Sequence, residues 1–120
     1  MKPPLVSICI PAYRAERYLP AALESVRAQR FTDWELIVTE DGSHDSTEDI
    51  VRAFARTVPQ SVRYDRHAQN QGLPATRNTG IAAARGEWIA LLDADDVWTT
   101  GHLETAAEQF SRGPAELIHS

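Results

Sequence analysis

Several common kinds of functional site are excluded by what this sequence lacks. Its 120 residues include one cysteine, Cys9, which excludes an internal disulfide and a zinc site built from several cysteines. Its histidines, at positions 44, 67, 102 and 119, have no metal-ligand spacing, and we expect all of them on the surface or in loops. Neither glycine-rich phosphate loop, G-x-x-x-x-G-K-[ST] or G-x-G-x-x-G, follows an apolar run.

Functions at a membrane or on nucleic acid are also disfavoured. No apolar run approaches the ~20 residues of a membrane-spanning helix, and the one near the N-terminus is too short for a signal peptide. Acidic residues outnumber basic ones 17 to 12, and the net charge of −5 argues against nonspecific nucleic-acid binding. With 42% hydrophobic and 24% charged residues, we expect one soluble, cytoplasmic domain over residues 1–120.

Short apolar, β-branched runs alternate with segments of helical periodicity. Strands are predicted over residues 5–10, 34–39, 61–66, 87–92 and 115–119. Helices are predicted between them, over residues 16–30, 46–58, 74–85 and 99–110. The third strand is expected at an edge, Pro11 is expected to end the first strand, and Ser46 is expected to open a capping box. This alternation predicts a doubly wound, mostly parallel α/β sheet flanked by helices.

In such sheets, ligands bind beyond the carboxyl ends of the strands. Three loops are therefore candidate sites: residues 11–13 after the first strand, 40–43 after the second and 93–96 after the fourth. Because the carboxyl ends of parallel strands share one edge, we expect these loops to lie together.

Three carboxylates, Asp93, Asp95 and Asp96, fall within the last of these loops. Carboxylates this close repel one another, and a bound cation is the usual relief. Oxygen ligands suit Mg²⁺ or Mn²⁺, which commonly bridge carboxylates to substrate phosphates. The sequence is equally consistent with Asp96 capping the next helix and the other two carboxylates being solvated.

The remaining candidates each have a structural interpretation beside a functional one. Asp41 fits an Asp-Gly turn, although a carboxylate at this edge could equally accept hydrogen bonds from a nucleobase or ribose. Tyr13 either stacks on a planar ring or covers the edge of the core. Arg77 lies in the first turns of a helix, as an anion ligand or as an exposed side chain. Cys9 is interpreted as a core residue rather than a nucleophile.

An ordered set of motifs runs along nearly the whole chain. It comprises VSICIPAY at 6–13, YL at 18–19, SV at 25–26, Gln29, WELIV at 34–38, DGS at 41–43, DST at 45–47, NQGL at 70–73, ATRNTG at 75–80, ARGEW at 84–88 and LLDADD at 91–96. Each motif is weak alone. In this order, the set resembles the N-terminal, nucleotide-sugar-binding half of family 2 glycosyltransferases, which have the GT-A fold.

The resemblance implies a nucleotide site at the first two loops. Pro11, Ala12 and Tyr13, with Glu16 nearby, would cradle the nucleobase and ribose of a nucleotide-diphospho-sugar donor. Asp41 would accept a hydrogen bond from the base, commonly uracil, so a UDP-sugar is favoured.

The resemblance implies a diphosphate and metal site at the third loop. Arg77 would lie near the diphosphate. Asp93-Ala94-Asp95 resembles the Asp-x-Asp motif, with Asp93 toward the ribose and Asp95 on Mg²⁺ or Mn²⁺, which would neutralise charge on the leaving nucleoside diphosphate. Family members transfer the sugar to an acceptor hydroxyl with inversion, and their general base is expected beyond Ser120. No catalytic residue is therefore assigned.

The resemblance also implies partners. The acceptor would be a saccharide or a lipid-linked molecule, as in polysaccharide biosynthesis, and a longer protein would act in the cytoplasm or at the inner membrane face. The chain departs from the family at Glu40, where Asp or Asn is usual, and at Arg14, where Asn is usual. Without the acceptor-binding half, we expect donor binding with little transfer, and self-association through the truncated sheet.

Two other functions compete with this interpretation. A non-catalytic nucleotide-binding or interaction module of the same fold would keep the donor-binding residues without turnover. The D-x-D-x-V pattern from Asp93 to Val97 also resembles the nucleophile loop of Asp-nucleophile phosphatases. In those enzymes the loop follows the first strand and a lysine lies well downstream, whereas the single lysine here is Lys2.

Overall fold

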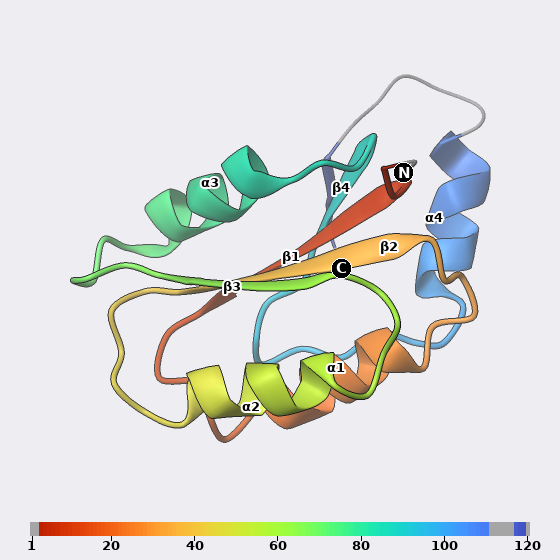
Figure 1. The fold of residues 1–120 in the computed structure, drawn as a ribbon. Coiled ribbons are helices and arrows are strands. Elements are labelled where there is room, and N and C mark those ends of the chain that lie inside the picture. Colours follow the sequence, from red (N-terminus) through yellow and green to blue (C-terminus); the bar gives the residue numbers. More distant parts are fainter. Residues whose placement is uncertain (1–2, 111–116, 120) are drawn as a thin grey trace.

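The computed structural model describes residues 3–110 and 117–119 (Figure 1). Within these residues the strands are β1 (Val6–Ala12), β2 (Trp34–Glu40), β3 (Val62–Arg66), β4 (Trp88–Leu91) and β5 (Leu117–His119). The helices between them are α1 (Leu19–Arg27), α2 (Thr47–Ala55), α3 (Leu73–Ala83) and α4 (His102–Phe110). The predicted alternation of strands and helices is confirmed, except that residues 115–116 of the predicted last strand lie outside the described residues.

The strands are all parallel and lie in the order β3-β2-β1-β4-β5. β1 is central and runs in register with β2, from Val6 beside Trp34 to Ala12 beside Glu40. The chain first builds outward on the β2 side of β1 and then on the β4 side, so the strand order reverses beside β1. The expected doubly wound parallel sheet, with β3 at an edge, is confirmed. The reversal point is where ligands bind in folds of this type.

The two faces of the sheet are covered by different helices (Figure 1). α1 and α2 lie over one face and α3 lies over the other. The main core fills the α1 and α2 face and includes Val6, Ile8, Ile10, Leu19, Leu23, Leu36, Val38 and Leu103. A smaller cluster of Cys9, Ile37 and Leu91 lies on the α3 face. Burial raises the pKa of the Cys9 thiol to about 12, so the thiol stays protonated and the predicted core role is confirmed.

Pro11 does not end β1, contrary to the sequence prediction. β1 continues to Ala12, whose carbonyl accepts the Asp41 N–H on the β2 side at 2.8 Å. On the β4 side, the Cys9 carbonyl accepts the Leu92 N–H at 3.1 Å, just past the end of β4. Because neighbouring residues of a strand point their backbone groups to opposite sides, Pro11 turns its nitrogen toward β4 beyond the last β4 residue. A missing N–H costs no ladder hydrogen bond there.

The capping box predicted at Ser46 is not formed. Ser46 precedes α2, but its side chain makes no capping hydrogen bond. Instead, Asp45 Oδ1 accepts the Thr47 N–H at 3.0 Å and Glu16 Oε2 accepts the Ser46 N–H at 3.0 Å. α1 and α2 both end three residues earlier than their apolar periodicity predicts. In the part of the chain that the structure describes, no helix is long and apolar enough to cross a membrane.

Candidate functional site

Two adjoining cavities open at the carboxyl edge of the strands. The first, of about 160 Å³, is lined by Pro11, Ala12, Tyr13, Asp41, Asn70, Gly72, Leu73 and Thr76. The second, of about 360 Å³, is lined by Pro11, Tyr13, Arg14, Ala15, Tyr18, Leu73, Asp93, Ala94 and Asp95. Pro11, Tyr13 and Leu73 line both cavities, so the two share a wall. The predicted meeting of the three loops at one edge is confirmed.

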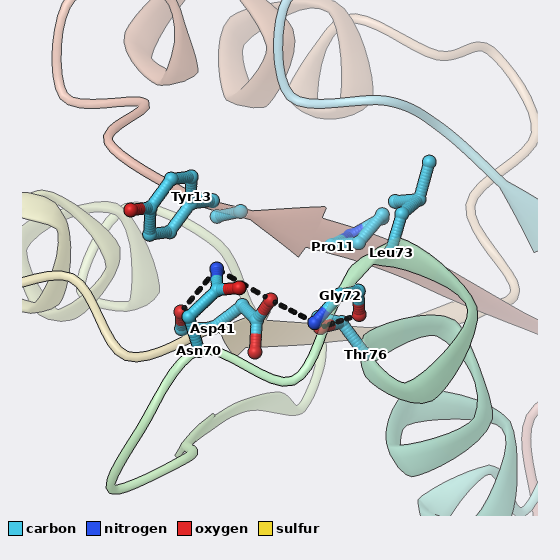
Figure 2. Close-up of a pocket in the computed structure, with 8 residues that line it drawn as sticks. Pro11, Tyr13, Asp41, Asn70, Gly72, Leu73 and Thr76 are labelled. Atoms are coloured by element: carbon cyan, nitrogen blue, oxygen red, sulfur yellow. Dashed lines mark hydrogen bonds between the residues drawn. The ribbon is translucent and has the colours of Figure 1, made fainter.

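Asp41 lines the first cavity, and each of its carboxylate oxygens accepts two hydrogen bonds. Figure 2 shows those from Asn70 and Gly72. Oδ1 faces His67 Nδ1 at 2.8 Å and accepts the Gln71 N–H at 2.8 Å. Oδ2 accepts the Gly72 N–H at 2.9 Å and an N–H of the Asn70 side chain at 3.0 Å. The residue is 3% exposed. Asp41 therefore organises the loop between β3 and α3, which is more than the short Asp-Gly turn that its local sequence suggests.

The pKa of Asp41 is lowered although its side chain is buried. Burial alone would raise it, but the hydrogen bonds from the His67 side chain, from the backbone of Gln71 and Gly72 and from the Thr76 side chain outweigh that cost. The carboxylate is therefore ionised at neutral pH. The side chains of His67 and Asn70 and the backbone of Gln71 and Gly72 hold this acceptor in place.

Two residues that the sequence did not single out complete this network. His67 is 10% exposed at its side chain and bridges Asp41 to Thr79, whose Oγ1 lies 2.7 Å from His67 Nε2. A loop position for His67 was predicted correctly, but its buried, bridging side chain was not. Gly42 has a φ of +80°, and a Cβ there would lie 2.5 Å from the Asn70 backbone nitrogen. Only glycine lets the loop close over this turn.

A second histidine also differs from its predicted position. His102 was expected at the surface or in a loop, yet it lies in α4 and stacks on Trp98.

Tyr13 forms one wall of the first cavity, with Leu73 across from it (Figure 2). Tyr13 is 45% exposed, so it does not cover the edge of the core, which was one of its two predicted roles. The guanidinium carbon of Arg14 lies 5.0 Å from the centre of the Tyr13 ring. Arg14 has a φ of 50°, an uncommon backbone conformation for a residue other than glycine. The strained turn after β1 therefore presents an aromatic ring to the cavity.

The third loop has a different character. Asp93 Oδ1 accepts a hydrogen bond from Arg77 Nη2 at 3.0 Å, and the two side chains are 42% and 30% exposed. Asp95 and Asp96 are exposed. Among the described residues, no group of three or more His, Cys, Asp or Glu side chains is arranged to hold a metal ion. Any cation here would therefore take at most two carboxylate ligands from the described residues, with substrate or water among its other ligands.

The alternative that Asp96 caps the next helix is wrong. α4 begins at His102, six residues further on, and its first N–H groups bond elsewhere. The His102 N–H is donated to the Thr99 carbonyl at 3.1 Å, and the Leu103 N–H is donated to Gln29 Oε1 at 3.0 Å. Asp96 instead donates its backbone N–H to the Asp93 carbonyl at 3.0 Å, which tightens the turn that carries the carboxylates.

Arg77 and Glu16 complete the set of predicted site residues. Arg77 lies on α3 and reaches the third loop through its ion pair with Asp93, while its Nε is buried without a hydrogen-bond partner among the described residues. A cationic group is therefore present between α3 and the carboxylates. Glu16 lines neither cavity, and its hydrogen bond to Ser46 ties the loop after β1 to the loop after β2.

Comparisons with known proteins give a consistent result. The family model described as "Glycosyl transferase family 2" matches residues 7–119. Among curated proteins, the chain is 37% identical over 100 residues to "UDP-Glc:alpha-D-GlcNAc-diphosphoundecaprenol beta-1,3-glucosyltransferase WfgD" of Escherichia coli, a match that covers 83% of this chain and 38% of WfgD. The chain spans 27% to 41% of the length of three other curated relatives.

Solved structures match over most of the described sheet. Crystal structures of S. aureus TarS 1–349 in complex with UDP and with UDP-GlcNAc align with a TM-score of 0.83 and 29% identity, covering 90% of this chain and 32% and 31% of those chains. The mannosyltransferase PcManGT from Pyrobaculum calidifontis, in complex with GDP-Man and Mn²⁺, aligns with a TM-score of 0.81 and 25% identity. That match covers 90% of this chain and 32% of PcManGT.

Proposed function

This chain belongs to glycosyl transferase family 2, and from that premise we propose that it binds the nucleotide-diphospho-sugar donor of a glycosyl transfer reaction. The nucleobase would occupy the first cavity and the diphosphate would lie along the second. The observation that carries the proposal is that the two cavities adjoin, with Pro11, Tyr13 and Leu73 in the walls of both. Together they hold a buried, ionised acceptor, Asp41, in one cavity and the half-exposed Asp93 and exposed Asp95 in the other. Family membership also removes the Asp-nucleophile phosphatase as an interpretation of Asp93.

The first cavity combines an aromatic ring, apolar surface and a hydrogen-bond acceptor, which suits a nucleobase. Tyr13 presents its ring on one side, and Pro11 and Leu73 add apolar surface. Asp41 accepts hydrogen bonds and donates none, so it favours a base with a ring N–H at its edge. Uracil and guanine both have one. UDP is the favoured nucleotide because TarS, at 29% identity, has been crystallised with UDP and UDP-GlcNAc.

The second cavity fits a divalent cation that is shared with a diphosphate. Asp95 and Asp93 supply hard oxygen ligands suited to Mg²⁺ or Mn²⁺, and the exposure of Asp95 leaves it free to bind. When bound, such a cation supplies charge stabilisation for the departing nucleoside diphosphate. Arg77 adds a second positive charge beside Asp93. The Mn²⁺ complex of PcManGT supports this assignment.

We further propose that the complete reaction is an inverting transfer of the sugar to a hydroxyl of a saccharide or lipid-linked acceptor. The diphosphoundecaprenol in the name of WfgD supports a lipid-linked acceptor. Within this chain, the residues bind and orient the donor. The Asp41 and Tyr13 end fixes the nucleoside, and the Asp93 and Asp95 end holds the diphosphate that leaves. No residue of the chain is assigned to deprotonate the acceptor.

Calorimetric titration tests the donor site directly. UDP, GDP, dTDP and CDP would each be titrated with and without Mn²⁺. We expect UDP to bind with Mn²⁺-dependent affinity and CDP, which has no ring N–H at the matching edge, to bind weakly. Asp95→Ala should remove the Mn²⁺ dependence, whereas Asp96→Ala, which deletes the same charge one residue further on, should keep it. Absence of binding for all four nucleotides would refute the proposal.

A transfer assay separates an enzyme from a non-catalytic module of the same fold. Both would bind the donor, but only a transferase domain would release UDP from a UDP-sugar when it is supplied with an acceptor in a longer protein. Sedimentation of the 120-residue chain tests the predicted self-association, which should appear as a concentration-dependent rise in apparent mass.

A further inference from the structure

We propose that the side chain of Asn70 occupies the position on Asp41 that a nucleobase N–H takes, and that it is displaced when the donor binds. Asn70 would then compete with the nucleobase and lower donor affinity, because a base must replace its hydrogen bond to enter the first cavity. This inference rests on the proposed donor-binding function and deepens it.

The first step is a count of acceptor positions. An ionised carboxylate has about four lone-pair sites. In Asp41 all four are used, two on each oxygen, by His67, Gln71, Gly72 and Asn70. A nucleobase N–H therefore has no vacant acceptor on Asp41 unless one of these donors leaves.

The second step asks which donor can leave. Gln71 and Gly72 donate backbone N–H groups, and Gly72 is the residue from which α3 begins. His67 is 10% exposed at its side chain and is held on its far side by Thr79. The Thr76 side chain, which also lowers the pKa of Asp41, is buried on α3, and its Oγ1 donates to the Gly72 carbonyl at 2.8 Å. Moving any of these four would require the loop or α3 to move. Asn70, by contrast, is an exposed residue that donates through its side chain, which can leave by a change of rotamer with the backbone in place.

The third step concerns where that side chain lies. Asn70 lines the first cavity, and its amide nitrogen sits on the Tyr13 side of Asp41 (Figure 2). The nitrogen also contacts the Asp41 carbonyl oxygen, but at 3.3 Å this second bond is long. The carboxylate fixes the orientation of the amide, since only its NH₂ end can donate to Asp41. The Asn70 side-chain amide carries an N–H group and a C=O group side by side, as does the edge of uracil that includes N3–H.

The displacement of Asn70 has a different cost for different nucleobases. Uracil N3–H, thymine N3–H or guanine N1–H can replace the Asn70 donor with a new one, so Asp41 remains fully satisfied. Cytosine N3 is an acceptor, and it would face the carboxylate with lone pair against lone pair. Displacing Asn70 for cytosine would leave a buried charge short of one hydrogen bond, which is costly. Asp41 therefore excludes bases that bring no donor, and Asn70 sets the hydrogen bond that an entering base must replace.

Removal of the Asn70 side chain tests the inference. In Asn70→Ala we expect UDP with Mn²⁺ to bind roughly three- to ten-fold more tightly than to the unmodified chain, because the base no longer competes with an internal hydrogen bond. CDP affinity should stay low. Gln69→Ala is the matched control, since Gln69 is exposed in the same loop and lines neither cavity, and it should leave UDP affinity unchanged. Equal or weaker UDP binding by Asn70→Ala would overturn the inference.

A second measurement covers the case in which the substitution loosens the loop. In the unmodified chain, the side-chain NH₂ signals of Asn70 can be assigned by their loss in Asn70→Ala. On addition of UDP and Mg²⁺, which is diamagnetic, these signals should shift and exchange faster, while the backbone amides of Gln71 and Gly72 stay protected. If UDP binds and the Asn70 signals stay protected, the inference fails and the donor site stands. If no nucleotide binds any variant, the proposed function fails and the inference fails with it.

Discussion

Two carboxylate sites at the same edge of the sheet are built in opposite ways. Asp41 is 3% exposed and fully supplied with internal hydrogen-bond donors. Asp95 is exposed, and Asp93, at 42% side-chain exposure, is engaged by Arg77 alone among the described side chains. The difference follows from solvation. A buried carboxylate without partners is expensive, so Asp41 must be satisfied before any ligand arrives. Exposed carboxylates are solvated by water, so they need no internal hydrogen-bond donors before a cation binds.

This contrast separates stability from binding. Residues around Asp41 should contribute to both, because the same hydrogen bonds fold the loop before α3 and shape the first cavity. Residues around Asp95 should contribute to ligand binding with little effect on folding. Four experiments test that separation, in order of decreasing expected effect.

Asp41→Ala should have the largest effect, lowering the free energy of unfolding by about 3 kcal/mol, because it leaves the buried donors of His67, Gln71 and Gly72 without an acceptor. Urea denaturation followed by circular dichroism measures the change. Asp41→Asn, which keeps one acceptor oxygen, should lose less. A loss no greater than that of Asp95→Ala would show that the Asp41 network does not stabilise the fold.

Asp95→Ala should show the opposite pattern. Its free energy of unfolding should stay within about 0.5 kcal/mol of the unmodified chain, as expected for an exposed residue. Its Mn²⁺-dependent gain in UDP affinity should fall at least roughly ten-fold, because a cation ligand is lost. Calorimetry and urea denaturation on the same sample measure both quantities. A large loss of stability with unchanged Mn²⁺ dependence would reverse the comparison.

Acidification should weaken the Asp41 site selectively. The pKa of Asp41 is lowered in the folded state from its ordinary value of 3.8, so its ionised form adds stability above that value. This contribution should be lost as the pH falls below 3.8 through the folded-state pKa. The pKa values of Glu35 and Asp45 are lowered as well, so the difference between the unmodified chain and Asp41→Ala isolates Asp41. That difference should shrink as the pH falls below about 3.8, and a constant difference would contradict the assignment.

Arg77→Met should have the smallest effect. The Arg77–Asp93 pair is partly exposed, so its loss should cost about 0.5 kcal/mol of stability, with less difference at high salt. Arg27→Met, which removes an exposed pair with Glu24 within α1, is a control of similar size. Denaturation at low and high salt measures both. A salt-independent loss several times larger for Arg77→Met would mean that Arg77 is a core residue rather than part of the open site.

Much of the carboxyl edge of the sheet could be predicted from local sequence. The alternation of apolar runs with helical periodicity predicted the parallel sheet, and the residues that follow each run predicted which loops share its carboxyl edge. Errors arose where the outcome depended on distant partners. Pro11 continues β1 because β4 ends early beside it, and α2 is capped by Asp45 and Glu16 rather than by Ser46. Local propensity contains neither fact.

The sequence by itself determined the order and type of the elements and the presence of carboxylates after β2 and β4, because hydrophobic periodicity and strand ends are local properties. Only the tertiary structure decided what each carboxylate touches. The donors to Asp41 lie 26 to 31 residues away along the chain and meet it only when β3 pairs with β2 and the loop before α3 folds back. Burial then requires that those donors satisfy Asp41, whereas the exposed Asp95 is left to water and to ligands.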